Sequence, residues 1–142
     1  MITIVSYIDP VHRSELIQLW TGAFGYDTAH NSPGLAIDKK LAMQDELLFV
    51  ALVEGRVVGS VMAGYDGHRG WLYSVAVNAA QQKKGLGSAL VRHAEAALAE
   101  RGCMKINLQI RGGNEAVTAF YESLGYGVEK RVSMGKLLPQ NF

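Results

Sequence analysis

The chain has 142 residues, of which 49% are hydrophobic and 19% charged, a composition typical of a globular protein. This length is sufficient for one domain with its own core, and we expect a single domain over residues 1–142. Its 14 basic and 13 acidic residues leave a formal net charge of +1, so nothing indicates a nucleic acid or a membrane surface as a partner. Because no signal peptide and no apolar run of about eighteen residues occurs, we expect a cytoplasmic protein.

Hydrophobic periodicity in the amino-terminal half predicts strands and two helices. We expect a strand at Met1–Ile8, a helix at Val11–Phe24, a loop at Gly25–Gly34, a helix at Ala36–Gln44, and strands at Leu47–Val53 and Arg56–Tyr65. The apolar face of the first helix consists of Leu16, Trp20, Ala23 and Phe24. Trp20 is therefore expected in the core. Glu54-Gly55, between the last two strands, is a hairpin signal.

The carboxy-terminal half alternates strands with helices. We expect a turn at Asp66–Gly70, a strand at Trp71–Val77, a helix at Ser88–Arg101, a strand at Met104–Ile110, a helix at Glu115–Ser123 and a last strand pair at Gly127–Leu138. Gly102 fits the left-handed residue that ends a helix. The single cysteine, Cys103, cannot form an internal disulfide, and no Cys/His cluster has zinc spacing. We expect Cys103 to be a small core residue rather than a nucleophile.

The order of these elements predicts a mixed sheet. The strands before and after the helix at Ser88–Arg101 must run parallel, because a helical crossover joins them. The strands joined by hairpins are antiparallel. The sequence therefore predicts an α/β fold of the α+β kind, with a mixed central sheet flanked by helices.

The stretch Gln82–Ser88 has the character of an anion-binding turn. It lies between a predicted strand and a predicted helix, whose first backbone N–H groups lack intrahelical partners. These groups and the positive end of the helix dipole favour a phosphate. Gly85 and Gly87 have no Cβ, so a pyrophosphate can come close to the backbone, and Lys83 and Lys84 add positive charge. The turn is neither a Walker loop nor a dinucleotide fingerprint, since neither motif occurs here.

Two motifs together resemble the GNAT superfamily of N-acetyltransferases. Gln82-x-x-Gly85-x-Gly87 resembles the acetyl-coenzyme A loop of that family. The segment Asn114–Tyr126 resembles its N-x-x-A-x-x-F-Y-x-x-x-G-[FY] motif, although no alanine stands at the motif's alanine position, on either side of which lie Ala116 and Ala119. The run from 61 to 70 also resembles small bacterial members of the YpeA type. The resemblance extends from about residue 49 to 137.

This resemblance implies a fold, a reaction and a set of site residues. It implies the GNAT fold, whose two central parallel strands splay apart so that pantetheine lies between them. It also implies acetyl-CoA as co-substrate without a metal, and acetyl transfer to a primary amine of a small molecule or a protein. Tyr121 matches the family tyrosine that acts on the leaving sulfur. The residues implied to bind the cofactor are Val75, Ala76, Val77, Gln82, Lys83, Lys84, Gly85, Leu86, Gly87, Ser88 and Asn114.

Each of these residues also has a purely structural interpretation. The glycines can simply mark the start of a helix, and Asn114 is a good N-cap in its own right. Tyr121 can be a core aromatic with a satisfied hydroxyl. Two other functions stay open: a non-catalytic module that binds coenzyme A as a sensor or regulator, and a phosphate- or nucleotide-binding protein. The second does not explain the motif at Asn114–Tyr126.

The acceptor side is less defined by the sequence. The strand at Trp71–Val77 has no Glu or Asp to serve as the general base, so water, Asp66 or His68 are the candidates. Asp27 and Asp66 can form an acidic wall for a cationic amine. The alternative for Asp66 is an ordinary Asp-Gly turn. A homodimer stays open.

Overall fold

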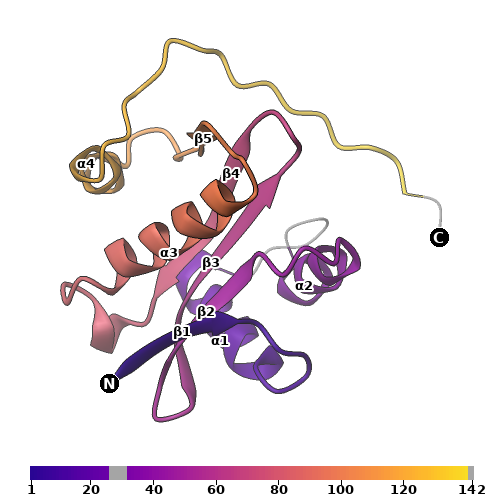
Figure 1. Cartoon of the computed structure of the whole chain (residues 1–142), viewed down its shortest axis with the longest axis vertical. Coiled ribbons are helices and arrows are strands. Elements are labelled where there is room, and N and C mark those ends of the chain that lie inside the picture. Colours follow the sequence, from indigo (N-terminus) through magenta and orange to yellow (C-terminus); the bar gives the residue numbers. More distant parts are fainter. Residues whose placement is uncertain (26–31, 141–142) are drawn as a thin grey trace. The chain divides into compact units, whose positions relative to one another are not determined.

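A computed structural model describes residues 1–25 and 32–140 of the chain (Figure 1). They fall into two units, Met1–Gln109 and Ile110–Phe142. The elements are β1 (Ile2–Ser6), α1 (Arg13–Phe24), α2 (Pro33–Ala42), β2 (Leu48–Val53), β3 (Arg56–Tyr65), β4 (Gly70–Val77), the 3-10 helix η2 (Ala79–Gln81), α3 (Leu86–Glu100), β5 (Ile106–Asn107) and α4 (Glu115–Ser123). Within the described ranges, no helix combines the length and the apolar character that crossing a membrane requires.

The first unit contains a five-stranded sheet in the order β1-β2-β3-β4-β5. The first three pairings are antiparallel, and β4 pairs with β5 in parallel. The predicted mixed sheet is therefore confirmed. The hairpin at Glu54-Gly55 is confirmed as well, because both residues have the positive φ, 52° and 76°, that a two-residue turn of this kind needs.

Two neighbouring residues of β3 mark the two faces of this sheet. A Cβ placed on Gly59 would lie 2.9 Å from Cδ1 of Leu90 in α3, whereas Oγ of Ser60 accepts a hydrogen bond of 2.8 Å from Nε1 of Trp20 in α1. Consecutive strand residues point to opposite faces, so α3 covers one face and α1 the other (Figure 1). Ile37 of α2 is buried in the same cluster as Trp20, which places α2 on the α1 face.

The cluster on the α1 face joins both amino-terminal helices to the sheet. Its buried members are Tyr7, Leu16, Trp20, Ile37, Leu48, Val50, Val57 and Ala76. The predicted core position of Trp20 is confirmed, since only 4% of it is exposed. Phe24 was expected on the same helical face but is 47% exposed. It is the last residue of α1, and Ala23, which was expected on this face as well, is also exposed.

Helix α3 begins two residues earlier than predicted, and it ends at Glu100, one residue before the predicted end. Its N-cap is Gly85, with φ 81° and ψ 5°, a left-handed conformation that costs glycine little. At the other end Gly102 has φ 89°, and its N–H bonds to the carbonyl of Ala99 while the N–H of Cys103 bonds to that of Leu98. This pair of bonds is a Schellman motif. Cys103 is partly buried beside the sheet.

Two strand predictions for the carboxy-terminal part are wrong. The strand expected at Met104–Ile110 contains only Ile106–Asn107, which pair with the first two residues of β4. The strand pair expected at Gly127–Leu138 is not formed in the second unit, whose described residues hold only the helix α4. Its apolar side chains are exposed, for example Val132 at 89% and Met134 at 91%. Alternation without a buried face gives a strand little stabilisation.

Candidate active site

Strands β4 and β5 lie together only at their amino ends. Gly70 pairs with Ile106 and Trp71 with Asn107, and the N–H of Gly70 donates to the carbonyl of Lys105 at 2.9 Å. Beyond these pairs β4 continues for six residues to Val77, while β5 has ended. Parallel strands that part at their carboxyl ends leave the crevice in which α/β proteins bind ligands.

A β-bulge divides β4 at the place where it has left β5. Ala76 pairs with Ser60 and Tyr73 with Met62, so β4 has one more residue than β3 between these pairs. The extra residue is accommodated at Ser74, whose φ is 51°. Ser60 and Met62 point to the same face, so Tyr73 and Ala76 also share that face although they are three residues apart. On the carboxyl side of the bulge, the alternation of β4 residues between the two faces of the sheet is therefore shifted by one residue.

The bulge is attached to the core by a chain of two buried hydrogen bonds. Nε1 of Trp20 donates to Oγ of Ser60 at 2.8 Å, and Oγ of Ser60 donates to the carbonyl of Ser74 at 2.9 Å. Ser60 is 0% exposed. A buried hydroxyl that both accepts and donates in this way is fully used.

The connection from β4 to α3 carries most of the predicted cofactor-binding residues. It starts at Asn78, whose side chain accepts from the N–H of Ala80 at 2.9 Å and caps η2. Nε2 of Gln82 donates to the carbonyl of Val77 at 3.1 Å, which ties the turn to the end of the strand. Lys83 has a φ of 64°. Lys83 and Lys84 are exposed and point no charge into the core.

The amino end of α3 has the groups that an anion needs. The first intrahelical bond is donated by Ala89 to Gly85, so the N–H groups of Leu86, Gly87 and Ser88 have no intrahelical acceptor. A Cβ on Gly85 would meet nothing within 4 Å, so there is open space in front of the helix. Backbone donors, a helix dipole and room beside them fit a pyrophosphate group.

The second motif lies in the second unit, on α4. Oδ1 of Asn114 accepts from the N–H of Val117 at 3.2 Å, so the capping interpretation of Asn114 is confirmed. Tyr121 is 8% exposed, and its ring contacts those of Phe120 and Tyr126, with centroids 4.9 and 5.7 Å away. Burial raises the pKa of Tyr121 to about 12. The phenol therefore carries its proton throughout the neutral range.

The turn after β3 is built by Asp66. Its Oδ1 accepts from the N–H groups of His68 at 2.8 Å and Arg69 at 2.7 Å. These backbone bonds lower the pKa of the Asp66 carboxyl. Nη1 of Arg69 lies 3.0 Å from Nε2 of His68, and since a guanidinium only donates, this nitrogen accepts. The turn interpretation of Asp66 thus has direct support. Asp27, the other candidate for an acidic wall, lies outside the described residues.

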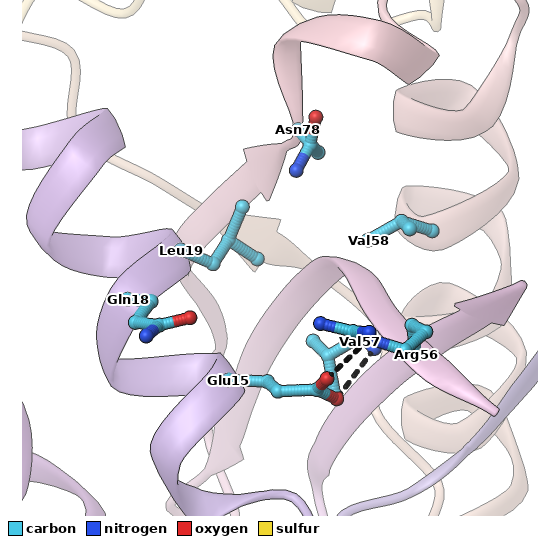
Figure 2. A pocket seen from close by; sticks show the side chains of 7 residues that line it. All are labelled: Glu15, Gln18, Leu19, Arg56, Val57, Val58 and Asn78. Atoms are coloured by element: carbon cyan, nitrogen blue, oxygen red, sulfur yellow. Dashed lines mark hydrogen bonds and ion pairs between the residues drawn. The ribbon is translucent and has the colours of Figure 1, made fainter.

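A pocket of about 220 Å³ lies between α1 and the start of β3. Figure 2 shows Glu15 of α1 turned toward the side chain of Arg56, which it meets in an ion pair of 2.7 Å. The other oxygen of Glu15 accepts from the N–H of Val57 at 3.0 Å. Asn78 lines the pocket, but none of the predicted cofactor-binding residues does. The carboxylate of Glu15 is already paired with Arg56 and with the N–H of Val57, so it is not available as a reactive group in the pocket. In the described ranges no cluster of three His, Cys, Asp or Glu side chains can hold a metal ion.

Sequence reasoning missed the bulge and the residues that hold it. No periodicity shows an extra residue in a strand, because the alternation of β4 is interrupted at only one position. The signal that was available is Ser60, a polar residue in an otherwise apolar strand of the hairpin. A buried serine hydroxyl needs a hydrogen-bond partner, and a buried tryptophan such as Trp20 needs an acceptor for its indole N–H.

Comparison with known proteins agrees with this arrangement. The sequence profile of the Acetyltransferase (GNAT) family matches residues 13–126. An acetyltransferase of Sodalis glossinidius is 45% identical over 127 residues, which make up 89% of this chain and 82% of that protein. The structure of the ribosomal-protein-S18-alanine N-acetyltransferase from Escherichia coli is 25% identical, with a TM-score of 0.68 over 88% of this chain and 77% of that one.

A more distant structure has the same fold. The NatC complex bound to Gag peptide and CoA is 19% identical, with a TM-score of 0.80 over 92% of this chain and 87% of that one. The family profile covers most of the chain and the relative from Sodalis glossinidius covers most of its length. The chain therefore belongs to the GNAT family of acetyltransferases and is an acyl-CoA N-acyltransferase.

Proposed function

We propose that this enzyme transfers an acetyl group from acetyl-CoA to a primary amine, and that residues 1–142 act as one catalytic domain in the cytoplasm. The observation that carries the proposal is the continuity of β4, its bulge and the amino end of α3. One strand-turn-helix segment offers both an open strand edge and an anion site, the two features that an extended molecule with a pyrophosphate needs.

The residues that hold acetyl-CoA follow from this segment. The pantetheine arm binds to backbone groups of Val75, Ala76 and Val77 along the part of β4 that has left β5. The pyrophosphate binds to the N–H groups at Gly85–Ser88. Gln82 fixes the turn through the carbonyl of Val77 at 3.1 Å, and Lys83 and Lys84 contribute an attractive charge. The bound thioester supplies the acetyl group.

The chain contributes to acyl transfer by positioning and by hydrogen bonds. Backbone N–H groups at the bulge stabilise the negative charge that develops on the carbonyl oxygen. Holding amine and thioester in line accounts for much of the rate. The hydroxyl of Tyr121 donates a hydrogen bond to the leaving sulfur. Because its pKa is raised to about 12, well above that of a thiol at about 8.5, this contact is a strong hydrogen bond more than a complete proton transfer.

The acceptor is an amine of a protein or of a small molecule. One similar structure is an alanine N-acetyltransferase of a ribosomal protein, and another holds a peptide, which supports testing protein amino termini first. Asp66 is committed to its turn, and Nε2 of His68 accepts from Arg69, so of the three candidates for the general base we favour water.

The experiment is an acetylation screen with two readouts. Purified protein is incubated with acetyl-CoA and with peptides of varied amino terminus, lysine peptides, polyamines and amino acids. Free thiol and product mass are both measured. The proposal is supported by thiol release that depends on one acceptor class, together with a product that is heavier by about 42 Da, the mass of the added C₂H₂O. Coenzyme A binding without thiol release over all classes argues for a non-catalytic module.

A further inference from the structure

We propose that Trp20 and Ser60 are positioning residues, which set the bulge of β4 in the shape that the transfer reaction uses. Trp20 donates a hydrogen bond to Ser60 at 2.8 Å, and Ser60 donates one to the carbonyl of Ser74 at 2.9 Å. The consequence for catalysis rests on the proposed function, since it is there that β4 binds the acetyl donor.

The need for such a support follows from the bulge. At Ser74 the ladder between β3 and β4 is interrupted, and a residue other than glycine holds a φ of 51°. A backbone conformation of this kind persists only when its surroundings determine it.

Ser60 is placed to supply that determination. It pairs in register with Ala76, on the carboxyl side of the bulge, and its hydroxyl reaches the carbonyl of Ser74 across the strand pair. The bond therefore connects the two ends of the bulge through β3. An exposed serine would exchange this bond with water, but Ser60 is 0% exposed and has no such competitor.

Trp20 determines the direction of the serine hydroxyl. Indole nitrogen only donates, so Oγ of Ser60 must accept from it, and the hydroxyl proton is left to point at Ser74. Trp20 is itself fixed in the cluster that joins α1 to the sheet, where 4% of it is exposed. The helix α1 thereby acts on the bulge of β4, although it contributes no group to the transfer itself.

The test separates a positioning role from ordinary core packing. The variants are Ser60→Ala, Trp20→Phe and the double variant, with Ile37→Val as the matched control from the same buried cluster. Amide hydrogen exchange of Ser74–Val77 is measured in the free protein. Exchange at the amides of β2 serves as the internal reference for global stability.

Removal of the Ser60 hydroxyl should speed exchange at the bulge by about tenfold or more, beyond any change at the reference amides, because it removes the buried partner of the Ser74 carbonyl. Ile37→Val should change both sets equally. Trp20→Phe should add little to Ser60→Ala, because Trp20 acts through Ser60. In steady-state assays, kcat should fall by about tenfold in Ser60→Ala while KM for acetyl-CoA changes by less than about threefold.

The exchange and kinetic results together decide whether Ser60 and Trp20 position the bulge. Equal changes at the bulge and at the reference amides overturn the proposal, and so does faster exchange at the bulge with unchanged kcat. Additive effects of the two substitutions overturn the role of Trp20. If the wild-type protein binds no coenzyme A, the proposed function fails, while exchange in the free protein still reports whether Ser60 holds the bulge.

Discussion

Gly70 is the position where one added methyl group should disturb the site most clearly. It is the first residue of β4 and pairs with Ile106 of β5. A Cβ there would lie 2.7 Å from Sγ of Cys103, 3.1 Å from Cδ1 of Leu98 and 3.3 Å from Cγ1 of Ile106. Three contacts at these distances cannot all be relieved by one rotation, so Gly70→Ala should push β5 and the end of α3 away from β4.

The size of the effect follows from the cost of overpacking. An extra methyl group in a packed core costs about 1–3 kcal/mol. At about 4 °C for each kcal/mol in a chain of this size, Tm should fall by about 4–12 °C. The strands meet only at Gly70 and Trp71, so a shift there should also move the crevice and raise KM for acetyl-CoA by several-fold.

Thermal unfolding of matched variants provides the assay. Gly64→Ala in β3 is the control, because the nearest atom to its Cβ would be Nζ of Lys40 at an ordinary 3.8 Å, and its Tm should change by less than about 2 °C. Gly70→Ala combined with Cys103→Ala removes the closest contact, so the two substitutions together should cost less than their sum. Equal Tm values for Gly64→Ala and Gly70→Ala, or additive losses in the double variant, would show that Gly70 is not closely packed against Cys103.

Three further predictions concern the proposed site. Gly87→Val should abolish coenzyme A binding in calorimetry without unfolding the protein, because the side chain blocks the approach to the helix amino end, whereas Lys84→Ala should lose only a modest factor; unchanged affinity in folded Gly87→Val removes the site from this turn. Tyr121→Phe should lower kcat by a factor within or somewhat below the range of about 10²–10⁴ that is typical of general-acid catalysis, with little change in coenzyme A affinity. Turnover within about twofold of wild type would mean that Tyr121 is only a core aromatic. The pKa of Asp66 is lowered, so its carboxylate stabilises the fold above its unfolded pKa of about 3.9, and that contribution is lost as pH falls through the lower folded value. Asp66→Asn should therefore reduce Tm at pH 7 but not near pH 2, and equal KM for a cationic acceptor in the two proteins assigns Asp66 to the turn alone.

Local signals predicted the elements whose conformation a few residues decide. Glu54-Gly55 forms the expected hairpin turn, and Gly102 ends α3 with the expected left-handed conformation. Both depend on backbone dihedrals that the residue type favours. The start of α3 was misplaced by two residues, because Leu86 and Gly87 were assigned to the turn although the left-handed Gly85 already allows the helix to begin.

Features that depend on distant partners were not predictable in the same way. Residues Gly127–Leu138 alternate like strands, but a strand also needs a neighbour to pair with, and alternation does not report one. The bulge at Ser74 depends on Trp20 and Ser60, which lie 54 and 14 residues before it in the sequence. The family motifs pointed to the turn at Gln82–Ser88 and to Tyr121, because each motif is a short continuous segment of the sequence. They could not indicate how the core holds the strand between them.

The central claim is that acetyl-CoA binds along the freed part of β4 and at the amino end of α3. The most direct measurement is an amide chemical-shift titration of the free enzyme with coenzyme A, with ATP and NAD at equal concentrations as comparison ligands. We expect saturable shifts at Val75–Val77 and Gly85–Ser88 with coenzyme A, and no shifts of the β4 amides with ATP or NAD. Shifts confined to other regions, such as the pocket beside Glu15, or no saturable shifts with coenzyme A at all, would contradict it.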